Sequence, residues 1–202
     1  MIRVIDYGLG NISAFLNMYK RLNIEAAVAH TPEDLQGADK LILPGVGAFD
    51  HAIELLDASG MRPMLDELVT QRKVPVLGIC VGMQILARCS DEGSAAGLGW
   101  IDGRVRGFKS LEKDLLLPHM GWNDVQPVGA ARLFAGLEDE CRFYFLHSYY
   151  FDCERQQDVA AVSRYGIDFS CALHAGNIYG VQFHPEKSHH FGAQLLKNFA
   201  EL

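Results

Sequence analysis

The sequence predicts an α/β fold with a mixed sheet, built as a single domain over residues 1–202. That length suffices for one well-buried domain and is short for two. The first half alternates apolar runs with helical patterns, beginning with a strand at residues 2–5 and a helix at 12–22. Three later apolar runs are bounded by turn residues and predict antiparallel strands, at 159–162, 167–173 and 178–183.

Composition and charge exclude several classes of protein. Apolar residues make up 49% of the chain and charged residues 21%, as in soluble globular proteins. The formal net charge of -7 argues against a nucleic-acid partner. Five cysteines with no C-x-x-C pair favour a reducing compartment and give no zinc pattern. No signal peptide is visible and no apolar run approaches the ~20 residues of a membrane span, so we expect a cytoplasmic protein without a membrane partner.

The first turns are rich in glycine. The loop at residues 6–11 contains Gly-Leu-Gly, but a third glycine and an acidic residue after the second strand are missing, so we do not expect a dinucleotide-binding loop. A second strand is predicted at 26–29, and residues 31–33, Thr-Pro-Glu, fit a helix start. A third strand at 40–43 runs into residues 44–47, Pro-Gly-Val-Gly. These glycines let the backbone approach a ligand and flip a peptide plane, although an ordinary βα turn is the alternative.

Helical patterns at residues 51–56 and 62–72 lead to the segment VLGICVGMQIL at 76–86. Its first part, 76–79, predicts a buried strand, and residues 83–88 predict the helix that follows. A residue at such a strand-to-helix corner adopts strained backbone angles, and the flanking glycines let strand and helix come close together.

This corner is predicted to present the thiol of Cys80 at the carboxyl edge of the sheet. Backbone N–H groups and the positive end of the following helix favour a thiolate and offer donors to an oxyanion. A buried, inert cysteine is the alternative, and this motif alone does not decide between them.

A second motif, His-Pro-Glu, follows about a hundred residues later. An apolar strand ends at His184, Pro185 fixes the turn, and Glu186 comes next. A thiolate nucleophile needs a nearby base, and that base needs an acceptor on its other nitrogen. Cys80, His184 and Glu186 therefore form a candidate catalytic triad.

The two motifs, GICVGMQ at 78–84 and HPE at 184–186, resemble those of the triad-type (class I) glutamine amidotransferases, and the resemblance covers essentially the whole chain. It implies a flavodoxin-like, doubly wound mixed sheet with an added antiparallel C-terminal sheet. The implied reaction is hydrolysis of L-glutamine to L-glutamate and ammonia through a thioester on Cys80, without a metal or cofactor. The resemblance assigns the oxyanion hole to the N–H groups of Val46 and Val81. It assigns glutamine binding to Gly47, Gln84, Ser148 and Tyr149.

Two further motifs narrow the resemblance. Glycine-rich residues 93–107 predict turns between short strands, and PHMGWN at 118–123 and YFLHSYY at 144–150 come after them. Judged by its side chains alone, PHMGWN fits a structural turn, and the aromatic side chains of YFLHSYY fit core and interface packing. Together they resemble the glutaminase subunits of imidazole glycerol phosphate synthase, more than the domains that serve anthranilate, guanylate or carbamoyl phosphate synthesis. A closing helix is predicted at 192–202, after a solvated loop that contains residues 189–190.

The resemblance implies a separate (β/α)₈ cyclase subunit that forms a heterodimer over the active-site face. It would use the ammonia to make imidazole glycerol phosphate and an aminoimidazole carboxamide ribotide in L-histidine biosynthesis. The expected interface residues are Asn11, Trp122 and Tyr144. The partner's ligand state is predicted to control the Val46 peptide, so that the isolated chain is nearly inactive.

Two departures on the docking side leave a paralogue open. Residues 12–14, Ile-Ser-Ala, stand where the family usually has a polar side chain that reaches the partner's ligand, and residues 115–116, Leu-Leu, where a basic one is expected. Such a paralogue would deliver ammonia to another synthase, for example one for a surface-polysaccharide sugar.

Three other classes fit the sequence less well. A cysteine peptidase of the flavodoxin-like kind usually carries histidine immediately after the nucleophile, where this chain has Val81. A serine-type α/β-hydrolase places its acid between nucleophile and histidine, whereas Glu186 comes last. A catalytically dead binding module would normally have lost part of the triad, which is intact.

Overall fold

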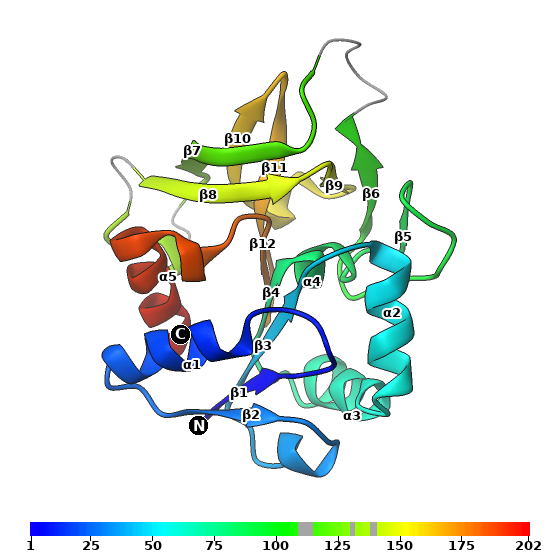
Figure 1. The fold of residues 1–202 in the computed structure, drawn as a ribbon, viewed down its shortest axis with the longest axis vertical. Coiled ribbons are helices and arrows are strands. Elements are labelled where there is room, and N and C mark those ends of the chain that lie inside the picture. The colour runs from blue at the N-terminus through cyan, green and yellow to red at the C-terminus, as the bar shows by residue number, and fades with distance from the viewer. Residues whose placement is uncertain (109–114, 130–131, 138–140) are drawn as a thin grey trace.

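One mixed sheet runs through the computed structural model, which describes residues 1–108, 115–129, 132–137 and 141–202 (Figure 1). Its strands are β1 (Ile2–Ile5), β2 (Ala26–Ala29), β3 (Lys40–Gly45), β4 (Val76–Cys80), β5 (Cys89–Ser90), β6 (Gly103–Gly107), β7 (His119–Pro127), β8 (Cys141–His147), β9 (Tyr149–Cys153), β10 (Val159–Tyr165), β11 (Ile167–Ala175) and β12 (Ile178–Val181). They lie in the order β2-β1-β3-β4-β12-β11-β10-β7-β8, with β9, β6 and β5 branching from β11.

The sheet is parallel from β2 to β12 and antiparallel from β12 to β8. This confirms the predicted fold class. The expectation of antiparallel pairing at 178–183 is only half right, because β12 is antiparallel to β11 and parallel to β4. β12 therefore joins the two halves of the sheet.

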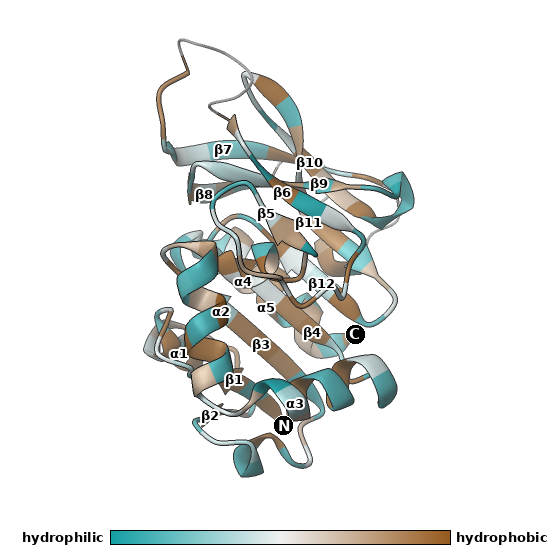
Figure 2. Ribbon diagram, turned by 90° about the vertical axis from the view of Figure 1, so that its right-hand side faces the viewer, coloured by the Kyte–Doolittle hydropathy of each residue, from teal (hydrophilic) through white to brown (hydrophobic). Residues whose placement is uncertain are grey.

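The helices are α1 (Ile12–Arg21), α2 (Phe49–Ala58), α3 (Arg62–Asp66), α4 (Val81–Gln84) and α5 (His189–Glu201). Shorter 3₁₀ segments lie at Glu33–Leu35, Arg132–Phe134, Gln156–Asp158 and Pro185–Lys187, and a π segment at Glu67–Gln71. In Figure 1, α1 and α5 cover one face of the parallel strands while α2 and α3 cover the other. Figure 2 shows the apolar strands β3 and β4 enclosed between these layers. No helix within the described ranges has the length and apolar character needed to span a bilayer.

The helix after the elbow is shorter than predicted. We expected residues 83–88 to be helical, but α4 ends at Gln84. The segment 97–101 folds back and uses the backbone carbonyls of this turn: Leu98 N–H donates to the Ile85 carbonyl at 2.8 Å, and Ile101 N–H to the Leu86 carbonyl at 3.1 Å. The glycine-rich stretch therefore ends α4 as well as leading into β6.

The last helix is longer than predicted at its start. His189 and His190 were expected in a loop, but they form the first turn of α5, where both side chains are exposed. The hydroxyl of Ser188, the residue before the helix, is turned back to the His184 carbonyl at 2.6 Å. The segment that follows β12 is thereby tied to the start of α5.

Gly82 lets the elbow pack against β3. A Cβ atom at this position would lie 1.9 Å from the Leu43 carbonyl oxygen, which no side-chain movement relieves. We expect Gly82→Ala to lower the free energy of unfolding by about 3 kcal/mol or more, because overpacking forces the backbone apart. Gly176→Ala is the control: it has φ of +64° and open space around the Cβ position, so only the left-handed backbone penalty of about 1 kcal/mol applies. Urea unfolding measures both, and equal losses would contradict this account.

Candidate active site

Three strand ends form the site. Cys80, at the end of β4, is level with Gly45 at the end of β3, and Ile79 is level with Val181 at the end of β12. Because these strands are parallel, their carboxyl ends meet at the same edge of the sheet. The elbow, the Pro-Gly-Val-Gly segment and the His-Pro-Glu segment are therefore brought together.

Cys80 has the strained backbone that the sequence predicts for the corner. Its φ of +56° and ψ of -114° lie outside the ordinary regions for a residue with a Cβ atom. The side chain is only 4% exposed. Its Sγ lies 3.8 Å from Nε2 of Gln182, which donates to it, and 3.9 Å from the Leu146 carbonyl oxygen.

His184 links the thiol to a carboxylate. Its Nδ1 lies 2.8 Å from Oε1 of Glu186, and His184 and Cys80 line the same pocket. Burial alone lowers the pKa of His184, but the hydrogen bonds and charges of Cys80 and Glu186 outweigh burial and raise this pKa to about 9. The side chains of His184 and Glu186 are nearly inaccessible, at 3% and 4% exposure. An imidazole with this raised pKa is able to accept and hold a proton from the thiol.

A pocket of about 250 Å³ opens over the sulfur. The predicted site residues that line it are Val46, Gly47, Cys80, Val81, Gln84, Ser148, Tyr149 and His184. Glu186 is not among the lining residues, since it contacts His184 through the ring nitrogen away from the thiol. Glu92 and Lys187 also line the pocket and place one carboxylate and one ammonium group there. No cluster of metal-ligating side chains occurs in the described part of the chain.

The Pro-Gly-Val-Gly segment at residues 44–47 is packed tightly at one end and has open space at the other. A Cβ atom on Gly45 would lie 2.7 Å from the backbone nitrogen of Gly82, so β3 is packed directly against the elbow. Val46, which follows β3, is 43% exposed at the pocket. Gly47 has φ of +98°, and a Cβ atom there would meet nothing within 4 Å. The Val46 peptide thus has room to reorient.

Several site residues were not predicted from the sequence. Tyr7, at the start of the first loop, donates its hydroxyl to the Pro44 carbonyl at 2.8 Å and so holds the Pro-Gly-Val-Gly segment. Burial first, and then the negative charge at Cys80, raise the pKa of Tyr7, so its hydroxyl stays protonated. Gln182 is fully buried one strand from the elbow. A Tyr in a turn and a Gln in an apolar strand carry no local signal for these contacts.

The three residues expected at the partner interface lie outside the pocket. Asn11 caps α1 by accepting the Ala14 N–H at 3.2 Å, so its side-chain oxygen already has a structural role. Trp122 is 40% exposed and stacks on His189, with 5.3 Å between ring centroids. Tyr144 lies opposite Trp122 on the neighbouring strand.

Comparison with known proteins identifies the class. A family model described as "Glutamine amidotransferase class-I" matches residues 3–202, and the chain belongs to this family. It is accordingly an enzyme with glutaminase activity. The fold agrees: the crystal structure of a glutamine amidotransferase superposes with a TM-score of 0.77 at 22% identity, covering 99% of this chain and 97% of that one.

Full-length relatives define the particular subfamily. Imidazole glycerol phosphate synthase subunit HisH of Bdellovibrio bacteriovorus is 59% identical over 204 residues, and that of Leptospira borgpetersenii is 51% identical over 204 residues. Both alignments cover 100% of each chain. Within the class I amidotransferases, the chain therefore belongs to the HisH subunits.

Proposed function

We propose that this chain is the cytoplasmic glutaminase subunit of an imidazole glycerol phosphate synthase. It hydrolyses L-glutamine and passes the ammonia to a (β/α)₈ cyclase subunit bound as a heterodimer over the pocket. The observation that carries the proposal is that Cys80 and His184 line one pocket together with the predicted glutamine residues, while Glu186 is hydrogen-bonded to Nδ1 of His184 at 2.8 Å.

The geometry supports a two-step hydrolysis. The Cys80 sulfur attacks the δ-carbonyl carbon of glutamine while His184 holds the thiol proton. The N–H groups of Val46 and Val81 bind the resulting oxyanion, and loss of one such donor typically costs about 10²–10³ in rate. His184 then gives its proton to the departing ammonia, which leaves a thioester. Water, deprotonated by His184, cleaves the thioester to glutamate and frees the thiol.

Charged groups of the pocket suit the other end of glutamine. Glu92 is half-buried, and its carboxylate fits the α-ammonium group of an amino acid. Lys187 fits the α-carboxylate, and its ammonium group lies 5.8 Å from the centre of the Tyr144 ring. Ser148 and Tyr149 line the same pocket.

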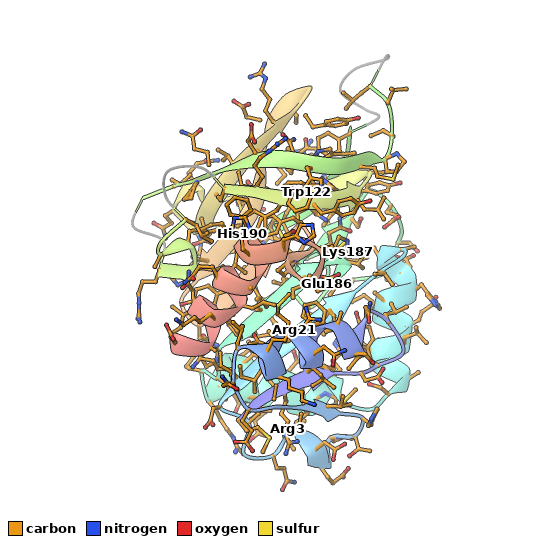
Figure 3. All side chains as sticks on the ribbon, turned by 60° about the vertical axis from the view of Figure 1, so that its left-hand side comes forward. Arg3, Arg21, Trp122, Glu186, Lys187 and His190 are labelled. Atoms are coloured by element: carbon orange, nitrogen blue, oxygen red, sulfur yellow. The ribbon has the colours of Figure 1, made fainter. Side chains whose placement is uncertain are left out.

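The surface around the pocket suits a partner. On the β7–β8 ribbon, Met120 is level with Leu146, and Trp122 with Tyr144. Met120 is 65% exposed and Leu146 38%, an apolar pair at the rim of the pocket. Figure 3 shows Trp122 and Lys187 on one side of the molecule, with Glu186 just below Lys187. Apolar cover here would keep ammonia from being protonated and lost to solvent.

The histidine-pathway acceptor is favoured over the polysaccharide paralogue. Both departures on the docking side, at 12–14 and 115–116, leave the triad unchanged. Identity of 59% over the full length of a HisH subunit supports the imidazole glycerol phosphate partner.

The test is glutamate release by the purified chain, alone and with the cyclase subunit encoded in the same genome. We expect little turnover alone and at least a hundredfold more with cyclase and its nucleotide substrate bound, because a missing oxyanion donor costs about 10²–10³. Equal turnover by the isolated chain and by the complex would refute the prediction that the partner controls the Val46 peptide. Turnover with a sugar-modifying synthase but not with the cyclase would assign the paralogous function instead.

A further inference from the structure

Two buried histidines outside the triad, His119 and His147, are hydrogen-bonded to each other. Nδ1 of His119 lies 2.9 Å from Nε2 of His147, across the β7–β8 pair. Burial lowers the pKa of His119 to about 4. Burial lowers the pKa of His147 to about 3. The hydrogen bond to the Tyr149 backbone opposes this shift, and the charges of the nearby His119 and His184 add to it. Both imidazoles are therefore neutral at neutral pH.

A neutral imidazole has one N–H and one lone pair, so its surroundings fix the direction of each hydrogen bond. Nδ1 of His147 lies 2.7 Å from the Tyr149 carbonyl oxygen and must donate to it. Nε2 of His147 is then an acceptor, and Nδ1 of His119 donates to it. The lone pair on Nε2 of His119 accepts from the Asn123 amide at 3.1 Å, and that amide also donates to the Arg164 carbonyl at 2.9 Å.

The series of hydrogen bonds that begins at Asn123 continues beyond the Tyr149 carbonyl. This oxygen also accepts from Nε2 of Gln84 at 3.2 Å, which uses its second lone pair. The same Gln84 nitrogen donates to Oε1 of Gln182 at 3.0 Å. Gln182 must therefore turn its nitrogen toward Cys80, where it lies 3.8 Å from the sulfur. One carbonyl thus sets the orientation of both amides.

We infer that His119 and His147 are positioning residues of the glutamine site, because they hold the Tyr149 carbonyl that orients the Gln84 and Gln182 amides. Gln84 is left with its oxygen available to the pocket, so it binds an N–H donor of the substrate. Gln182 is left with an N–H directed at the nucleophile. The inference rests on the proposed function and gives the PHMGWN segment a part in substrate recognition.

The packing around His119 allows a clean substitution. Its ring is stacked between Phe145, at 4.7 Å, and Tyr165, at 4.1 Å between centroids. A phenylalanine at this position keeps the stack but donates no hydrogen bond. The Nε2 acceptor of His147 is then buried and unpaired, and the imidazole loses the hydrogen bond that holds it in place against the Tyr149 carbonyl.

The experiment is steady-state glutamine hydrolysis by the complex with the cyclase subunit. We expect His119→Phe to raise the KM for glutamine about ten-fold, the usual effect of leaving one buried polar group unpaired, with kcat changed much less. His119→Asn puts an amide N–H near the Nδ1 position and should restore most of the affinity. Tyr165→Phe is the matched control: it keeps the stack, loses only the hydroxyl that donates to the Leu116 carbonyl, and should leave KM unchanged.

A second measurement does not depend on turnover. Cys80 is labelled in the complex with iodoacetamide, which needs no glutamine recognition, and with the glutamine-shaped reagent 6-diazo-5-oxo-L-norleucine. His119→Phe should slow only the second reaction, by about ten-fold. If that variant fails to fold, Asn123→Ala removes the half-buried residue at the end of this series of hydrogen bonds. It should slow the labelling by the glutamine-shaped reagent by a smaller factor.

Each failure has a distinct signature. Equal KM and equal labelling in wild type and His119→Phe would overturn the inference, as would a His119→Asn variant no better than His119→Phe. A wild-type complex that neither hydrolyses glutamine nor reacts with the glutamine-shaped reagent would refute the proposed function instead.

Discussion

Replacing Cys80 with alanine should abolish glutamine hydrolysis, with a loss in kcat on the order of 10⁶-fold, as for removal of a nucleophile in other triad enzymes. Without the sulfur no thioester forms, and His184 and Glu186 have no group to activate. The side chain is small and only 4% exposed, so the fold should tolerate alanine. Glutamate release by the complex measures the loss, and glutamine binding by calorimetry should be retained.

The matched control is Cys89→Ala. This cysteine is also free but exposed, on β5, away from the pocket-lining residues. Its substitution should leave kcat and KM unchanged. Turnover by Cys80→Ala at more than about a hundredth of the wild-type rate would rule out the thioester route.

The second large effect is expected from Glu186→Gln. The carboxylate accepts from Nδ1 of His184 at 2.8 Å, which leaves Nε2 for the thiol and stabilises the imidazolium. An amide removes the charge and is able to turn its NH₂ toward the ring. We expect kcat to fall on the order of 10²- to 10⁴-fold. A loss confined to KM would contradict this role.

The same variant should change the pH dependence of stability. His184 has its pKa raised from 6.5 to about 9 in the folded chain, so the folded state binds this proton more tightly than the unfolded state. The resulting stabilisation is complete below about pH 6.5 and is lost as the pH rises through about 9. The difference in free energy of unfolding between wild type and Glu186→Gln should therefore shrink across this interval. Urea unfolding below, within and above it measures the change, and a difference that grows with pH would contradict it.

The elbow and the His-Pro-Glu motif could be predicted because their signals are local. Gly78 and Gly82 flank Cys80; a Cβ atom on Gly78 would collide with the Gly82 backbone across the corner, and one on Gly82 with the Leu43 backbone of β3. The alternation of strand and helix patterns along the sequence was likewise enough to predict the parallel half of the sheet. The end of α4 was not predictable, since it depends on backbone hydrogen bonds from residues 97–101.

The contacts around the triad needed the structure. Tyr7 meets Pro44, and Gln182 meets Cys80, only through the order of the strands. His119 and His147 are 28 residues apart, and their hydrogen bond depends on the register of β7 against β8. Burial, stacking and tautomer direction are properties of that register, and the sequence of either strand alone does not contain them.

The position of β12 in the sheet has a consequence for control of the enzyme. This strand is paired along both edges, with β4 and β11, and it leads directly to His184, the proposed general base. Backbone amides in such central strands exchange with deuterated solvent only when the whole domain opens. Cys80 and His184 thus follow directly from paired central strands, whereas Val46 is exposed and Gly47 has open space around its Cβ position, so we expect an effector to act on this rim.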